Sequence, residues 1–202
     1  MERIIAKELL SIGAVFLRPE EPFTWASGIK SPIYCDNRLT LSAPEVRQKI
    51  EIGLATLVMK HYPECQMLMG TSTAGIAHAA ITASILGLPM GYVRGEAKDH
   101  GRGNRIEGKM DKGTKVVVIE DLISTGGSCI DVVEALREEG AEVLGIASIF
   151  TYGIKKGLMR IAGAGTVNYS LSNLDTLVEV AAEEGYIAPE WKNKIIEFRD
   201  SL

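Results

Sequence analysis

The sequence has few cysteines, no large excess of charge of one sign and no long apolar run. Its three cysteines are widely spaced and form no CxxC pair, which argues against a disulfide framework and against a zinc site; they are Cys35, Cys65 and Cys129. A formal net charge of -4 and the absence of a basic stripe argue against a nucleic-acid scaffold. These absences favour a reducing compartment, and we expect a cytoplasmic protein.

The first residues are typical of neither a signal peptide nor a membrane span, because charged side chains alternate there with apolar ones. The 202 residues contain no internal repeat and no low-complexity linker. We therefore expect one soluble domain over residues 1–202. An irregular segment rich in Pro, Gly and Ser runs as far as Pro32, and it predicts a small N-terminal flap within residues 1–40.

Apolar periodicity alternates between strand and helix along the chain. The expected strands lie at 67–69, 90–93, 116–119, 143–150 and near Val167. The expected helices lie at 2–12, from a capping box at 42–45, at 76–86, from about 128 to 139, at 174–182 and around Trp191. This alternation predicts an α/β fold with a Rossmann-like, mostly parallel sheet flanked by helices.

Residues 116–128 join a buried strand, two acids and a turn of glycines and hydroxyl residues. The β-branched residues at 116–119 predict a parallel strand that is covered on both faces. Glu120 and Asp121 follow at its carboxyl end, where open α/β sheets bind their ligands. The turn at 124–127 then opens the next helix.

This arrangement suits a sugar phosphate. The first N–H groups of a helix lack intrahelical partners and lie at the positive end of its dipole, and glycines let an anion approach them. Ionised carboxylates accept hydrogen bonds from sugar hydroxyls. The structural alternative is that the acids only end the strand and the glycines only turn the chain. A Walker loop is excluded because no Gly-Lys-Ser/Thr follows.

A second glycine-hydroxyl turn, Gly70-Thr71-Ser72-Thr73-Ala74-Gly75, leads into the alanine-rich helix at 76–86. It is either a simple tight turn or a second anion site built on a helix N-terminus. We favour the second interpretation, with pyrophosphate bound by Thr71, Ser72, Thr73 and Ala74.

Residues 94–105 are too polar and too rich in glycine for a helix or a strand, and they predict a mobile loop. A solvated surface loop is the structural alternative. Beside a phosphate site, Arg94, Lys98 and His100 suit a second role: they can bind the charge that develops on a pyrophosphate leaving group while the loop excludes water. Gly101-x-Gly103 is no dinucleotide fingerprint, since no third glycine follows.

Residues 23–38 form an aromatic-flanked turn with several N–H donors and one cation, Lys30. Such a turn can cover a flat acidic ring. The residues alone are equally consistent with a purely structural flap.

The motif at 116–128 closely resembles the phosphoribosyl pyrophosphate motif of the type I phosphoribosyltransferases. The resemblance implies that the two acids hold the ribose 2' and 3' hydroxyls and that the turn cradles the 5'-phosphate. The site implied in this way consists of Glu120, Asp121, Leu122, Ile123, Ser124, Thr125, Gly126, Gly127 and Ser128.

The segment Ser27-Gly28-Ile29-Lys30-Ser31-Pro32-Ile33-Tyr34 is similar to the hallmark of the orotate phosphoribosyltransferases, which purine-specific relatives lack. This resemblance implies transfer of ribose 5-phosphate to orotate, giving orotidine 5'-phosphate and pyrophosphate in pyrimidine synthesis. The flap would then cover the base, and orotate would contact Ser27, Gly28, Lys30 and Ser124.

The same resemblance implies a magnesium ion and a second subunit. Mg²⁺ would be held mainly by substrate and water, with no direct protein ligand. In that family a similar Arg...Lys-x-His loop reaches into the active site of the other subunit, so a symmetric homodimer is implied. Some members carry a lysine where this chain has Ala26 or Ala74, and an orotate-contacting arginine where it has Thr151-Tyr152.

Two other functions are compatible with parts of these patterns. A purine or other pyrimidine phosphoribosyltransferase would share the acid pair and both anion loops, but the flap segment argues against it. A regulator that binds phosphoribosyl pyrophosphate without turnover would need a nucleic-acid element, and the chain has no basic recognition helix. His61 and His78 pair with no nucleophile, and we expect core or surface roles for them.

Overall fold

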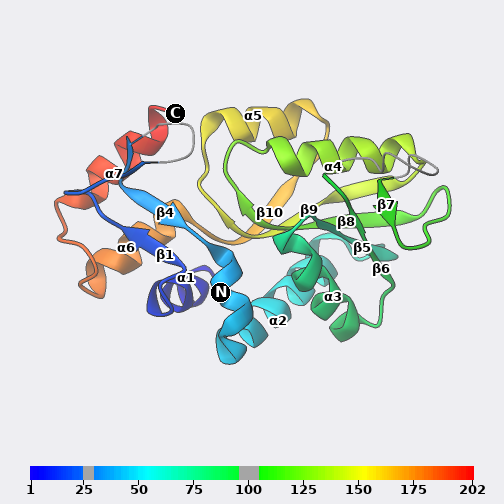
Figure 1. Cartoon of the computed structure of the whole chain (residues 1–202), viewed down its shortest axis with the longest axis horizontal. Coiled ribbons are helices and arrows are strands. Elements are labelled where there is room, and N and C mark those ends of the chain that lie inside the picture. The colour runs from blue at the N-terminus through cyan, green and yellow to red at the C-terminus, as the bar shows by residue number, and fades with distance from the viewer. Residues whose placement is uncertain (25–29, 96–104) are drawn as a thin grey trace.

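A six-stranded sheet forms the centre of the computed structural model, which describes residues 1–24, 30–95 and 105–202 (Figure 1). The strand order is β10-β9-β8-β5-β6-β7, and all neighbours are parallel except β6 and β7. The strands are β5 (Met67–Thr71), β6 (Met90–Val93), β7 (Ile106–Glu107), β8 (Lys115–Ile123), β9 (Glu142–Thr151) and β10 (Asn168–Asn173). The predicted mostly parallel sheet is confirmed.

Helices cover both faces of the sheet, with α4 and α5 on one face and α2 and α3 on the other (Figure 1). They are α1 (Glu2–Ser11), α2 (Pro44–His61), α3 (Ala74–Leu86), α4 (Gly127–Glu138), α5 (Lys155–Gly163), α6 (Leu174–Glu183) and α7 (Trp191–Asp200), with the 3-10 helix η1 (Asn37–Ser42) before α2. No helix in the described part of the chain has both the length and the apolar character needed to cross a membrane.

Strand β8 shows why the apolar run predicted a doubly covered strand. Val116 and Val118 pack into the cluster that contains α4, whereas Val117 and Ile119 pack into the cluster that contains α2 and α3. All four side chains are fully buried. Successive side chains of a strand point to opposite faces, so only a run without polar residues can fill both clusters.

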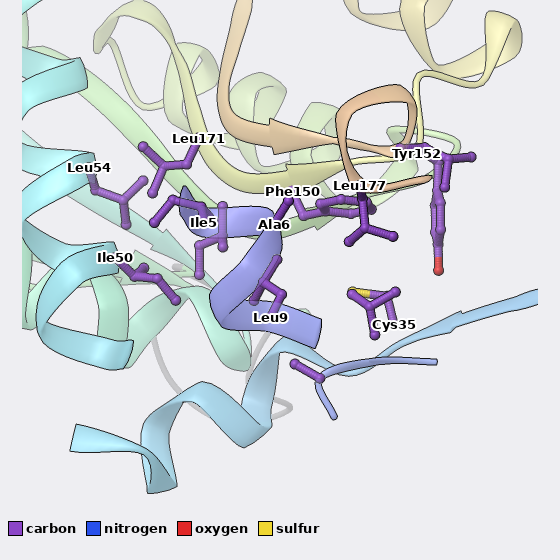
Figure 2. Close-up of a cluster of buried hydrophobic side chains, with 14 of the residues drawn as sticks. Ile5, Ala6, Leu9, Cys35, Ile50, Leu54, Phe150, Tyr152, Leu171 and Leu177 are labelled. Atoms are coloured by element: carbon purple, nitrogen blue, oxygen red, sulfur yellow. The ribbon is translucent and has the colours of Figure 1, made fainter. Parts of the chain in front are cut away.

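The first helix belongs to the hydrophobic core. Figure 2 shows Ile5, Ala6 and Leu9 of α1 among buried side chains from α2, β10 and α6. These neighbours include Ile50, Leu54, Leu171 and Leu177. The predicted flap of residues 1–40 therefore begins with a helix of the hydrophobic core, and short strands follow that helix.

Two small antiparallel sheets occupy much of the segment that we predicted to be irregular up to Pro32. Strand β1 (Val15–Leu17) pairs with β4 (Ile33–Cys35), and β2 (Phe23–Thr24) pairs with β3 (Lys30–Ser31). The pairs are too short for apolar alternation to reveal them. Their partners across the turn supply the hydrogen bonds that define them as strands.

The predicted capping box at 42–45 is wrong, although the helix and the proline in its first turn are confirmed. Ser42 belongs to η1, and α2 begins after Ala43, which makes no side-chain capping bond. Capping requires the residue before the helix to leave helical geometry. Here the 3-10 helix extends through Ser42, and the side chain of Arg47 donates to the Leu41 carbonyl at 2.8 Å.

Replacing Leu136 by Ala should destabilise the protein by about 2–5 kcal/mol, because this fully buried side chain fills the space between α4 and the sheet. Denaturant unfolding followed by circular dichroism measures the change. Glu134, which is exposed on the same helix, is the matched position: Glu134→Ala should change the free energy of unfolding by less than about 0.5 kcal/mol. Equal effects of both substitutions would contradict this packing.

Candidate active site

The ends of β5 and β8 lie side by side and bring the two predicted anion loops to the same edge of the sheet. The parallel register places Met69 opposite Val118 and Gly70 opposite Ile119. One residue further, the hydroxyl of Thr71 donates to Oε1 of Glu120 at 2.8 Å. A direct hydrogen bond therefore connects the start of one loop to the acid pair before the other.

Glu120 is buried between these strands, whereas Asp121 is partly exposed. Burial, together with the neighbouring Asp121, raises the pKa of Glu120 to about 8. The same carboxyl accepts from the backbone N–H of Asp121 at 3.0 Å. Burial therefore favours the protonated form of Glu120, which can donate a hydrogen bond as well as accept one.

The turn after β8 has the geometry of an anion site. Gly126 has a φ of 71° and forms the N-cap of α4, whose first residue is Gly127. A positive φ strains any residue with a Cβ, so glycine is required at this position. Ser128 is exposed in the first turn, and the N–H groups of that turn point toward the carboxyl edge of the sheet.

Helix α5, which sequence reasoning missed, packs against this turn. A Cβ on Gly157 would lie 2.5 Å from the carbonyl oxygen of Ser124, so the helix touches the turn backbone directly. Nη1 of Arg160 donates to the Thr125 carbonyl at 3.0 Å. The helix was missed because glycines at 157 and 163 obscure its periodicity, although Arg160 at its exposed end is a signal for anion binding.

The second loop leads into α3, which begins at Ala74. Ser72 and Thr73 are exposed, and the peptide bond between them is cis. Thr71 is buried and engaged by Glu120. A Cβ on Gly75 would lie 2.4 Å from the Ile119 carbonyl oxygen, so only glycine lets α3 start this close to β8. The hydroxyl of Ser72 donates to the Val93 carbonyl, so Thr73 and the first turn of α3 are the parts of the loop most open to a ligand.

Arg94 follows β6 at the same edge of the sheet. Its Nη1 is buried, lies 3.6 Å from Oε1 of Glu107 and has no hydrogen-bond partner among the described residues. Its backbone is held by Arg105: the Arg94 N–H donates to the Arg105 carbonyl at 2.9 Å, and Nε of Arg105 donates to the Arg94 carbonyl at 3.1 Å. Lys98 and His100, predicted for the same loop, lie outside the described residues.

The other predicted site residues are exposed, buried in the core or outside the described ranges. Lys30 is exposed in β3, and Ser27 and Gly28 lie outside the described residues, as does Ala26. Ile123 is buried in the core cluster of α4, and Leu122 packs against the other cluster. Only the backbone of these two strand residues can therefore line a sugar-phosphate site.

The residues brought together at this edge are the acid pair, the two helix N-termini and Arg94. They offer carboxyl oxygens for hydroxyl groups and N–H groups for phosphates. No group of three or more His, Cys, Asp or Glu able to hold a metal occurs in the described ranges. The oxygens of Glu120 and Asp121 are nevertheless the ligand type that Mg²⁺ accepts when substrate and water complete its shell.

Comparison with known proteins places the chain among enzymes that use phosphorylated ribose. The phosphoribosyl transferase domain family matches residues 45–168. An orotate phosphoribosyltransferase of Bacillus cereus (strain B4264) is 59% identical over 199 residues, which cover 98% of this chain and 95% of that protein.

Two solved structures share the fold. The orotate phosphoribosyltransferase from Aeropyrum pernix superposes with a TM-score of 0.78 at 30% identity, covering 91% of this chain and 99% of that one. The UMP synthase of Leishmania donovani superposes with a TM-score of 0.85 at 26% identity, and this chain spans 42% of its length.

Replacing Glu120 by Gln should make stability less dependent on pH. An unfolded Glu ionises near 4.5, whereas burial holds the pKa of Glu120 at about 8, so the wild type loses stability as pH rises between these values. Relative to the wild type, Glu120→Gln should gain stability on the order of 5 kcal/mol across this window, because each pKa unit corresponds to about 1.4 kcal/mol. Urea unfolding at several pH values measures it, with the exposed Glu134→Gln as control. Parallel curves for Glu120→Gln and the wild type would show that Glu120 titrates normally.

Replacing Gly157 by Ala should push α5 and the turn at 124–127 apart, because the new Cβ would clash with the Ser124 carbonyl oxygen. We expect the affinity for ribose 5-phosphate, measured by titration calorimetry, to fall about tenfold or more. Gly163 is the matched control: it lies in the same helix, and a Cβ there meets nothing within 4 Å. Gly163→Ala should leave the affinity within about twofold. Unchanged binding by Gly157→Ala would contradict the support by α5.

Proposed function

This chain belongs to the orotate phosphoribosyltransferases within the phosphoribosyl transferase domain family, and from that premise we propose how its residues carry out the reaction. The enzyme transfers ribose 5-phosphate from phosphoribosyl pyrophosphate to orotate, giving orotidine 5'-phosphate and pyrophosphate in pyrimidine synthesis. The single observation that supports this placement most is the Thr71–Glu120 hydrogen bond, which joins the two anion loops at the acid pair.

The donor occupies the carboxyl edge of the sheet. Glu120 and Asp121 hold the ribose 2' and 3' hydroxyls, and the turn from Ser124 to Ser128 receives the 5'-phosphate at the N-terminus of α4. The pyrophosphate lies on the neighbouring loop, where Ser72, Thr73 and the N-terminus of α3 are exposed. Thr71 contributes by holding Glu120, since its hydroxyl is already engaged there.

The protonation of Glu120 supports a role in binding the donor. A protonated Glu120 can donate to one ribose oxygen while Asp121 accepts from another hydroxyl. A cation bound at the site would favour the ionised form of Glu120, against the burial and the neighbouring Asp121 that raise its pKa. The acid pair can thus bind ribose oxygens both when Glu120 is protonated and when it is ionised.

The leaving group is stabilised by the cations of the loop after β6. The bond between C1 of ribose and the pyrophosphate oxygen breaks with its electron pair on pyrophosphate, through an oxocarbenium-like transition state. The ring nitrogen of orotate loses its proton to water and bonds to C1 from the opposite face. Arg94, Lys98 and His100 neutralise the pyrophosphate. The buried Nη1 of Arg94 forms an ion pair with Glu107 at 3.6 Å and no hydrogen bond among the described residues, so it keeps donor capacity for the pyrophosphate. The main contributions of the protein are to position the two substrates and to neutralise the charge on the pyrophosphate.

The base is covered by the flap. Lys30, Ser27 and Gly28 provide one cation and backbone N–H groups for the carboxylate of orotate, and Ser124 offers a hydroxyl from the phosphate turn. Lys30 is exposed on β3. Ser124 belongs to both subsites, which would place the base next to the ribose carbon that it attacks.

Magnesium fits this site. When bound, Mg²⁺ supplies positive charge to the pyrophosphate and ribose oxygens. Glu120 and Asp121 carry carboxyl oxygens, the kind of ligand that Mg²⁺ prefers. They would hold the ion indirectly, through the ribose hydroxyls and through water. The protein works as a cytoplasmic homodimer, a proposal that rests on the likeness of its Arg94-to-His100 loop to the loops that reach between subunits in this family.

The test mixes purified protein with orotate, phosphoribosyl pyrophosphate and Mg²⁺ and follows the loss of orotate absorbance. Adenine, hypoxanthine and uracil are supplied in parallel, with product analysis. We expect turnover with orotate alone. Asp121→Asn should lower kcat/KM by about a hundredfold, because it removes a carboxylate from the ribose site. Turnover with another base would overturn the acceptor, and binding of the donor without turnover with any base would indicate a regulator.

A further inference from the structure

A buried asparagine outside the predicted site contacts the acid pair through the backbone. Asn37, the first residue of η1, is fully buried, and its Nδ2 donates to the carbonyl oxygen of Asp121 at 2.7 Å. The other end of its amide is engaged as well, because Oδ1 accepts from the Cys35 thiol at 3.3 Å. Burial and the charges of Asp121 and Asp36 raise the pKa of that thiol, so it stays protonated as a donor.

The hydrogen bond from Asn37 reaches the part of β8 that extends beyond the end of its neighbour β5. The pairing of β5 with β8 ends at Gly70 opposite Ile119, whereas β8 continues to Ile123 with β9 alone on its other side. A backbone carbonyl beyond the end of a neighbouring strand needs another partner when it is buried. The side-chain amide of Asn37 takes the place of the missing strand and holds the backbone that carries the Asp121 carboxylate.

A network of buried polar side chains from η1, α3 and α2 contacts Asn37. The hydroxyl of Thr40 donates to the Asn37 carbonyl at 2.5 Å and lies 3.4 Å from Nε2 of His78. Nδ1 of His78 is 2.6 Å from Oε1 of Glu51, whose other oxygen accepts from Thr82 at 2.7 Å. The exposed fraction of each of these side chains is 1% or less. His78, expected in a core or surface role, is thus a member of a polar network inside the core.

Such a network is an unusual way to stabilise a core. A buried carboxyl and imidazole lose their hydration, and apolar residues of the same volume are often equally stable or more so. A network in which every member has a partner instead restricts its groups to one geometry. Here the restricted geometry runs from α2 and α3 through η1 to the strand that carries the acid pair.

We propose that Asn37 is a positioning residue for catalysis, which holds the Asp121 backbone so that the Asp121 carboxylate faces the ribose, and that Thr40, His78 and Glu51 hold Asn37 in place. This inference rests on the proposed function of the acid pair. It also connects two subsites, because only Asp36 separates Asn37 from the flap strand β4, whose last residue is Cys35. Displacement of a positioned group by even a fraction of a bond length lowers the rate of transfer.

The first test is Asn37→Ala, which removes the donor to Asp121. We expect kcat/KM for phosphoribosyl pyrophosphate to fall about tenfold and the affinity for ribose 5-phosphate to fall in parallel. Affinity for pyrophosphate, which binds the loop after β5, should stay within about twofold. Ser172→Ala is the matched control, since it removes another buried side-chain bond to a carbonyl, that of Glu2 at 3.0 Å, in β10.

The second test asks whether Asn37 acts through Asp121. In an Asp121→Asn background, adding Asn37→Ala should lower kcat/KM by less than about twofold, because the group that Asn37 positions is already lost. A full tenfold loss in that background, or equal losses of affinity for ribose 5-phosphate and pyrophosphate, would overturn the inference, as would kcat/KM within about twofold of wild type for Asn37→Ala alone.

A pair of variants at Thr40 keeps the test decisive if Asn37→Ala does not fold. Thr40→Val preserves the shape and removes the hydroxyl that donates to Asn37, so kcat/KM should fall about threefold or more, whereas Thr40→Ser should restore it to within about twofold. Equal kinetics for the two variants would overturn the inference. Absence of turnover by the wild type would instead overturn the proposed function, and the ribose 5-phosphate and pyrophosphate affinities of the variants would still decide the role of Asn37.

Discussion

The parallel pairing of β5 with β8 is the constraint on which the site depends. Two loops that lie some fifty residues apart in the sequence can serve one ligand only if their strands end at the same level, and the register of Gly70 with Ile119 ensures this. Gly75 then lets α3 start against β8, and Thr71 reaches Glu120. A slip of one residue would turn the Glu120 side chain to the opposite face of the sheet.

The same pairing gives the site its electrostatic character. Glu120 lies between strands, where burial and Asp121 raise its pKa to about 8. Such a group reduces stability above the pH at which an unfolded carboxyl ionises. It also leaves the site ready for hydroxyl groups and positive charge, which make an ionised Glu120 favourable. The protein thus keeps a destabilising group where its proposed donor binds, as functional sites often do.

Support for the site comes from both sides of β8. On one face, α5 touches the phosphate turn through Gly157 and Arg160. At the open side of the strand, Asn37 holds the Asp121 carbonyl. Neither contact supplies chemistry, but each fixes a backbone on which chemistry depends, and a ligand that must be held within a fraction of an ångström needs such support.

The sequence by itself determined the features that depend on neighbours along the chain. The apolar run before Glu120 predicted a doubly covered strand, and the glycines after it predicted a turn into a helix, because strand periodicity and positive φ are local properties. The family resemblance of the same segment, and of the flap, agreed with the comparisons.

Only the tertiary structure decided which distant groups meet. It showed that α2 begins at Pro44 without a capping box, because η1 occupies Ser42. It raised the pKa of Glu120, since burial between two strands is not visible in one of them. It also brought Asn37 to Asp121, 84 positions away. Pairing, burial and long-range hydrogen bonds arise from contacts between segments, and a local pattern carries no record of its partner.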